Sequence, residues 1–287
     1  MEDLDRERVV PGCDRAILDD LRWLGLRWDE GPDAGGPCGP YTQSERTPLY
    51  EAALAHLEAN GWIFLCDCSR AEIARAASAP HAGEEGPRYP GTCRARGMKP
   101  RAFKRPPAVR LAVPHDERSH VAIEDRVLGP LVEDVAQSTG DFVLRRGDGV
   151  FAYQLAVVVD DLAMGVTEVV RGADLAASAP RQVLLARLLG GEAPGFAHVP
   201  LLLGENGERL AKRAKGVPLA DQRAQGVAPA ALVRAIAAAY GVDVGDAGGG
   251  DPCAVIDAVA GALDWEALRG RRVTTDAIFE RLGGSAT

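Results

Sequence analysis

The sequence has no long hydrophobic run: no apolar stretch in its 287 residues approaches the roughly 18 residues that a membrane-spanning helix needs. The first ten residues, MEDLDRERVV, are charged and lack the apolar centre of a secretory signal peptide. Aromatic residues make up only 5% of the chain, and the sequence has no internal repeat. These absences argue against membrane and repeat proteins and predict a cytoplasmic protein with no membrane partner.

Cysteine is also scarce, and three of the six cysteines lie close together: Cys66, Cys68 and Cys93. In a reducing compartment such a cluster indicates a metal site more than disulfides. Three thiolates leave one position open in a tetrahedral zinc site, and His81 or Tyr89 could fill it. General ligand preference favours His81, because imidazole is a common zinc ligand. The alternative is three reduced cysteines without a metal.

The net charge of −8 argues against a protein that coats nucleic acid over its whole surface. Residues 86–105 are the exception, since this segment holds seven basic residues and no acid. It is either a surface that faces phosphate groups or a solvated basic loop. The basic residues are Arg88, Arg94, Arg96, Lys99, Arg101, Lys104 and Arg105.

Helical periodicity recurs along the chain. The expected helices cover 14–24, 45–59, a stretch after Pro180, 228–240, 252–263 and 274–282. Short apolar runs typical of strands cover 62–65, 108–113, 131–136, 142–146 and 196–204. Asp14 is the expected N-cap of the first helix. Strands that alternate with helices predict an α/β fold, with helices on the faces of a parallel sheet.

The segment VVDDLAMGVTEVVRGADL carries charged residues at the ends of two apolar runs. The first run ends in Asp160 and Asp161, and the length of 153–161 allows either a strand or a helix. The second run ends in Arg171. Because ligands bind at the carboxyl ends of parallel strands, we expect a small polar ligand near Arg171. Asp160 and Asp161 are expected to form a turn or to orient an arginine.

Several long motifs resemble the catalytic domain of the glutamyl-tRNA synthetase family. They are EDLDRERVVPG at the N-terminus, YTQSER at 41–46, RLAKRAKG at 209–216, and YQLAVVVDDLAMGVTEVVRGADLAASAPRQVLLARLLG from Tyr153. The resemblance extends from residue 1 to about 216 and is strongest to the short branch of the family, the glutamyl-queuosine tRNA(Asp) synthetases. Only about 70 residues follow the RLAKRAKG loop, too few for the large anticodon-binding region of a full synthetase.

The resemblance implies a class I synthetase catalytic domain with a Rossmann-like sheet over residues 1–216. It further implies a zinc-binding insertion at about 66–106 and a small helical subdomain over 217–287. Such enzymes use ATP, with Mg²⁺, to convert L-glutamate to glutamyl-adenylate, and the short branch then transfers glutamate to the queuosine of tRNA(Asp). Two alternatives are a catalytic-domain synthetase that charges a tRNA 3′ end and an inactive zinc- and tRNA-binding module.

The resemblance also assigns roles to individual residues. Glu2 matches the acid that holds the amino group of the substrate, and Tyr153 and Arg171 match other glutamate-binding positions. Lys212 matches the catalytic lysine that contacts the ATP phosphates. The zinc ligands of the family fall on Cys66, Cys68, Tyr89 and Cys93, which shifts the preference for the fourth ligand from His81 to Tyr89.

Two departures from the family pattern stand out. In the ATP-binding loop, Arg209 and Ala211 replace a lysine and a serine, so one hydroxyl donor is lost. In addition, the sequence starts after the strand and helix that carry the HIGH-type ATP motif in the family, which suggests a misplaced start site or a truncation. On that expectation the sheet lacks its first strand and exposes an apolar edge.

Overall fold

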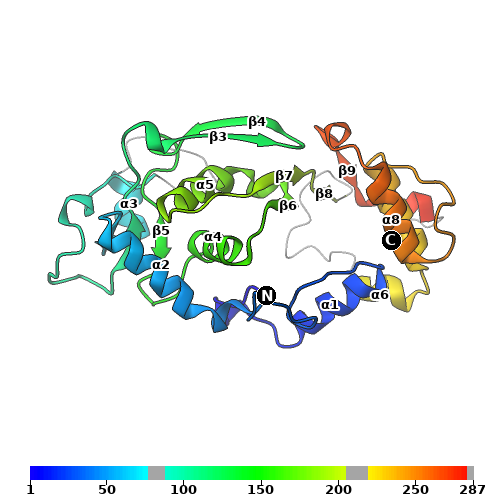
Figure 1. Ribbon diagram of the computed structural model, residues 1–287, viewed down its shortest axis with the longest axis horizontal. Coiled ribbons are helices and arrows are strands. Elements are labelled where there is room, and N and C mark those ends of the chain that lie inside the picture. The colour runs from blue at the N-terminus through cyan, green and yellow to red at the C-terminus, as the bar shows by residue number, and fades with distance from the viewer. Residues whose placement is uncertain (77–87, 205–218, 283–287) are drawn as a thin grey trace.

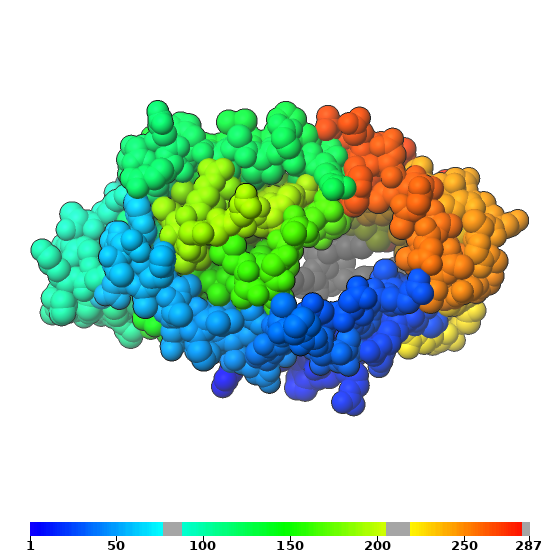
Figure 2. Space-filling model, in the orientation of Figure 1, coloured from blue at the N-terminus to red at the C-terminus, as the bar shows by residue number. Residues whose placement is uncertain are grey.

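The computed structural model describes residues 1–76, 88–204 and 219–282. Within these residues no helix is long and apolar enough to cross a membrane. The molecule is elongated: the central sheet lies between the cysteine-rich insertion at one end and the C-terminal helices at the other (Figure 1). In Figure 2 the surface is hollowed between the blue N-terminal segment, the green central part and the orange C-terminal helices.

The central sheet has four strands in the order β4 (Gly129–Asp134), β3 (His120–Asp125), β7 (Gly195–Val199) and β6 (Glu168–Gly172). Strands β3, β7 and β6 are parallel, whereas β4 is antiparallel to β3. The expected all-parallel sheet is therefore a mixed sheet, because β3 and β4 form a hairpin. Strand β6 is the edge strand of this sheet, and its Val170 is 54% exposed.

Helix α5 (Ala179–Leu188) packs against β3 of this sheet, and α4 (Tyr153–Met164) packs against α5. The sequence left 153–161 open between strand and helix, and it is helical because Leu155, Val158 and Val159 share one buried face. Gly165 ends α4 in the left-handed conformation at φ +66°. Asp160 and Asp161 therefore lie in a helix.

A second, antiparallel sheet carries the insertion. Its strands are β1 (Ile63–Cys66), β2 (Ala108–Leu111) and β5 (Val143–Arg145). Helix α2 (Thr47–Ala59) leads into β1, and α3 (Arg70–Ala76) follows it. Strands β2 and β5 fall within the apolar runs expected from the sequence, and β1 is shifted by one residue from the expected 62–65.

Short helices and one strand pair form the C-terminal region. They are α6 (Leu219–Ala224), α7 (Pro229–Ala239), α8 (Pro252–Ala262), α9 (Thr275–Phe279), and the parallel pair β8 (Leu202–Leu203) and β9 (Val273–Thr274). Helix α1 (Cys13–Trp23) packs with these helices through Trp23 and the adjacent Leu24. Its N-cap is Gly12 at φ +82°, so the expectation that Asp14 caps this helix is wrong.

Asp160 connects α4 to the segment before α2. Its carboxylate accepts hydrogen bonds from Arg46 Nε at 2.6 Å, Gln43 Nε2 at 2.9 Å and Tyr50 Oη at 3.0 Å. Arg46 is 2% exposed and also donates to the backbone carbonyls of Cys38 and Pro40. Burial, together with the charge of Asp160, raises the pKa of Tyr50. Asp160 thus orients an arginine, one of the two roles expected for it.

We predict that Asp160→Asn lowers the free energy of unfolding by about 3–5 kcal/mol, because it leaves the Arg46 charge buried without its partner. Urea unfolding measures the change. The matched control is Arg27→Ala, which breaks the exposed Arg27–Asp257 ion pair and should shift the urea midpoint by only a small fraction of that amount. Similar midpoint shifts in the two variants would contradict the prediction.

Candidate functional site

A hydrogen-bonded chain crosses the carboxyl ends of the three parallel strands. Asp125 ends β3, His198 lies in β7, and Arg171 lies in β6 directly opposite His198. The distance from His198 Nδ1 to Asp125 Oδ2 is 2.5 Å, and Arg171 Nε donates to His198 Nε2 at 3.1 Å. Because Nε2 accepts this bond, Nδ1 must carry the proton that is donated to Asp125.

The guanidinium of Arg171 has further partners. Its Nη1 lies 3.5 Å from the hydroxyl of Tyr153, and its Nη2 donates to the carbonyl of Leu175 at 3.3 Å. The group also lies over the ring of Phe196, 5.2 Å from the ring centroid. Burial lowers the pKa of Arg171, and the neighbouring Tyr153 opposes that shift. The expected position of Arg171 at the carboxyl end of a strand is confirmed.

Tyr153 is the first residue of α4 and connects Arg171 to a cavity of about 1100 Å³. Glu2 lines the same cavity and is exposed. Burial raises the pKa of Tyr153, the charge of Glu2 raises it further, and the charge of Arg171 lowers it. The structure therefore brings Glu2, Tyr153 and Arg171 into one neighbourhood. Arg171 is not one of the described residues that line the cavity, but its Nη1 lies 3.5 Å from the hydroxyl of Tyr153, which does line it.

A chain of polar side chains joins α4 to α5 beside Tyr153. Gln182 Nε2 donates to Gln154 Oε1 at 3.0 Å, and Gln154 Nε2 donates to Ser178 Oγ at 3.1 Å. A hydrogen bond with Gln182 also acts on Tyr153 and lowers its pKa. Gln182 was not singled out from the sequence. In the structure it is 4% exposed within an apolar helix, and a buried glutamine requires a polar partner.

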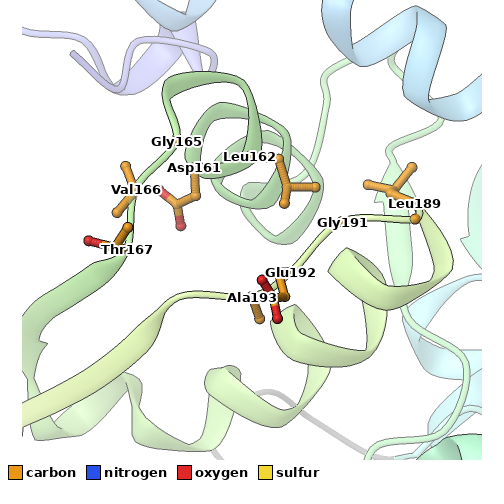
Figure 3. A pocket seen from close by; sticks show the side chains of 10 residues that line it. Asp161, Leu162, Gly165, Val166, Thr167, Leu189, Gly191, Glu192 and Ala193 are labelled. Atoms are coloured by element: carbon orange, nitrogen blue, oxygen red, sulfur yellow. The ribbon is translucent and has the colours of Figure 1, made fainter.

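Asp161 lies beside Asp160 but has a different environment. Asp161 lines a cavity of about 600 Å³. Figure 3 shows its side chain between the end of α4, the start of β6 and residues 189–193. Burial raises the pKa of Asp161 to about 6, with a further contribution from the charge of Asp160 and an opposing one from Arg171. Asp161 thus adds negative charge near Arg171 at neutral pH.

The three clustered cysteines come together as the sequence predicts. The sulfur atoms of Cys66, Cys68 and Cys93 all lie within 4.8 Å of one another, and the Cys68–Cys93 distance is 3.7 Å. The hydroxyl of Tyr89 lies 3.5 Å from Cys66 Sγ and 4.0 Å from Cys68 Sγ. His81 lies outside the described residues, so the structure places only Tyr89 beside the cysteines.

Neighbouring groups hold this cluster in place. Asp67 lies between two of the cysteines and accepts hydrogen bonds from the backbone N–H of Lys104 at 3.0 Å and from Arg101 at 3.3 Å. The Lys104 bond is the main cause that lowers the pKa of Asp67 to about 2. The backbone N–H of Cys93 donates to the Tyr89 hydroxyl at 2.7 Å, and Arg110 lies over the Tyr89 ring.

Most of the basic segment 86–105 interacts within the protein. Arg94 pairs with Asp141, Arg101 pairs with Asp67, and both Lys104 and Arg105 pair with Glu72. Arg88 donates to the carbonyl of Ala136. Arg96 and Lys99 are exposed, which leaves them as the best candidates for a surface that faces phosphate groups.

Lys212, Arg209 and Ala211 lie outside the described residues, as does the rest of the RLAKRAKG loop.

Sequence reasoning also missed Asp125 and His198. The available signal was a histidine inside the apolar run FAHVPLLLG, since a buried histidine requires polar partners. The partner of His198 lies 73 residues away in the sequence, so only the fold reveals the pair.

The sequence and the fold are similar to those of tRNA synthetases. A family model described as the catalytic domain of class I tRNA synthetases (E and Q) matches residues 1–246. The Glutamyl-Q tRNA(Asp) synthetase of Symbiobacterium thermophilum is 52% identical over 238 residues, which cover 81% of this chain and 72% of that protein. Glutamate–tRNA ligase 1 of Halorhodospira halophila is 41% identical over 244 residues, which cover 83% of this chain and 50% of that protein.

A solved structure has the same fold. The glutamate tRNA ligase of Elizabethkingia meningosepticum, crystallised in complex with its amino acid, superposes with a TM-score of 0.74 at 24% sequence identity. The match covers 98% of this chain and 60% of that protein, so this chain spans less than two thirds of its length. At this identity the likeness supports the fold alone.

Proposed function

The chain belongs to the class I tRNA synthetases for glutamate and glutamine, and on that premise we propose that it transfers glutamate to the queuosine of tRNA(Asp). The position of Arg171 beside Tyr153 supports glutamate as the amino-acid substrate, together with Glu2, which lines the same cavity as Tyr153. A guanidinium binds a carboxylate through two parallel hydrogen bonds, and an acid attracts an ammonium group. These groups match the two ends of glutamate.

The reaction has two steps. An oxygen of the glutamate α-carboxylate attacks the α-phosphorus of ATP, and the bond to pyrophosphate breaks. A hydroxyl of the queuosine cyclopentenediol then attacks the acyl carbon and loses its proton, an ester forms, and AMP leaves. We assign the ATP phosphates to Lys212, with Mg²⁺ as the accompanying ion, because a cation there stabilises the charge that develops on them.

The similarity to the Symbiobacterium protein supports queuosine as the acceptor, because that relative matches at higher identity and over more of its length than the Halorhodospira ligase. The competing proposal is a synthetase that charges the 3′ end of a tRNA. The two differ in the tRNA group that forms the ester. An inactive zinc- and tRNA-binding module would form no ester at all.

We predict that the protein transfers labelled glutamate to tRNA(Asp) that contains queuosine even after the 3′-terminal adenosine has been removed. Because the proposed acceptor is the modified base, tRNA(Asp) without queuosine should accept no glutamate. Acid-precipitable radioactivity measures the transfer. Labelling that requires the terminal adenosine but not queuosine would show that the protein charges a 3′ end, and no labelling of either tRNA would contradict both enzymatic proposals.

We also propose that Cys66, Cys68, Tyr89 and Cys93 bind one Zn²⁺. With Zn–S bonds of about 2.3 Å, sulfurs at two corners of a tetrahedron lie about 3.8 Å apart. The distance of 3.7 Å between Cys68 Sγ and Cys93 Sγ fits this value. The Tyr89 hydroxyl lies beside the sulfurs of Cys66 and Cys68, where a fourth ligand is needed.

We propose a division into domains that matches a class I synthetase. Residues 1–216 form the catalytic domain, about 66–106 form its zinc-binding insertion, and 217–287 form a small helical subdomain. The helices α6 to α9, all after residue 217, support this division. The zinc would connect β1 to the irregular segment around Cys93 and thereby stabilise the insertion.

We predict one zinc ion per chain and its loss, or at least a tenfold weaker affinity, in Tyr89→Phe, because the variant lacks the ligand oxygen. His81→Ala is the control and should keep its zinc. Metal content after dialysis against a weak chelator measures both, by atomic emission. If His81→Ala alone loses zinc, the assignment of the fourth ligand to Tyr89 is wrong.

The glutamate site is tested by Arg171→Lys, which keeps the charge but loses the planar pair of donors. We predict that the glutamate KM in ATP–pyrophosphate exchange rises by at least about tenfold, equivalent to about 1.4 kcal/mol, while the ATP KM changes little. Arg187→Lys, an exposed substitution on α5, is the matched control. An unchanged glutamate KM, or a rise in the ATP KM instead, would remove Arg171 from the glutamate site.

A further inference from the structure

We propose that His198 is a positioning residue for glutamate recognition: it accepts the Nε–H of Arg171 and so directs the Nη groups of that arginine toward the substrate carboxylate. The proposal rests on the proposed function, because it concerns the same site. It goes beyond that function by naming the contacts that orient the substrate-binding arginine, which are His198 and, behind it, Asp125.

The imidazole of His198 is fixed on its Asp125 side. His198 is 0% exposed and Asp125 is 4% exposed. The Asp125 carboxylate accepts the His198 ring N–H and also the backbone N–H groups of Val127 at 2.9 Å, Leu128 at 2.8 Å and His198 at 3.2 Å. Burial opposes ionisation of Asp125, but these hydrogen bonds lower its pKa. An anchored, ionised carboxylate holds the ring in the tautomer with Nδ1 protonated.

Arg171 is fixed in turn on its Nε side. The Nε–H bonds to His198, and the Phe196 ring supports both side chains: it stacks on His198 with centroids 5.6 Å apart and lies under the guanidinium. Nη2 bonds to the carbonyl of Leu175, so Nη1 is the group directed toward Tyr153. An arginine held in this way loses fewer conformations when a carboxylate binds.

A neutral imidazole suits this position better than an acid. If a carboxylate contacted Arg171 directly, it would compete with the substrate carboxylate for the same cation. The imidazole of His198 accepts the Nε–H without a full negative charge and keeps Asp125 one ring away from Arg171. The chain Asp125–His198–Arg171 therefore orients the guanidinium and leaves most of its positive charge for the substrate.

The test compares two replacements of His198 in glutamate-dependent ATP–pyrophosphate exchange. His198→Leu fills a similar volume but cannot accept the Arg171 Nε–H, so the glutamate KM should rise at least about tenfold. His198→Gln keeps an acceptor oxygen near the position of Nε2, so the glutamate KM should stay within about threefold of the parent. The ATP KM and kcat should change little in both.

The matched control is His120→Leu, which removes an exposed histidine paired with Asp134 and should leave both KM values unchanged. In the free protein, nitrogen NMR should show His198 with Nδ1 protonated and Nε2 unprotonated. If His198→Leu does not fold, as judged by circular dichroism, Asp125→Asn replaces it: the tautomer is no longer fixed, and the glutamate KM should rise.

The outcomes separate the two proposals. If Arg171→Lys raises the glutamate KM but His198→Leu or its substitute does not, the positioning role is wrong and the glutamate site stands. A rise of equal size in His198→Gln and His198→Leu, or an Nε2-protonated His198 in the NMR spectrum, also overturns the positioning role. If the parent protein shows no exchange with glutamate, the proposed function fails and this inference fails with it.

Discussion

The hydrogen-bonded chain from Asp125 through His198 to Arg171 is the interaction on which the candidate site depends. It joins the carboxyl ends of three neighbouring parallel strands and places a cation at the edge of the sheet. A parallel sheet brings these three residues together although they are far apart in the sequence. His198 and Asp125 are buried away from water, so the partner of the Arg171 Nε–H is set by the fold itself.

Two further anchor points surround this chain. Asp160 on α4 connects Arg46, Gln43 and Tyr50, and so fixes the segment before α2 against the helix that begins with Tyr153. The cysteine cluster connects β1 to the irregular insertion. The adjacent carboxylates Asp160 and Asp161 have different surroundings. Asp160 accepts hydrogen bonds from Arg46, Gln43 and Tyr50, whereas burial raises the pKa of Asp161 to about 6.

Sequence reasoning identified the elements whose pattern is local. Helices α2, α5, α7 and α8 were expected within a few residues of their observed bounds, because each has a continuous apolar face. Strand β3 was missed because only Val121 and Ile123 are large apolar residues in HVAIED, which leaves no continuous apolar run. The motifs pointed to Arg171 and Tyr153, but His198, Asp125 and the internal ion pairs of Arg94 and Arg101 depend on contacts between distant segments, which no local pattern reveals.

The most direct test of the central claim is a crystal structure with a non-hydrolysable analogue of glutamyl-adenylate. We predict that the side-chain carboxylate of the glutamyl group lies within hydrogen-bonding distance of an Arg171 Nη and of the Tyr153 hydroxyl. We also expect the bond from Arg171 Nε to His198 to remain intact. A glutamyl group bound elsewhere, or an Arg171 that has left His198 in order to reach it, would contradict the account.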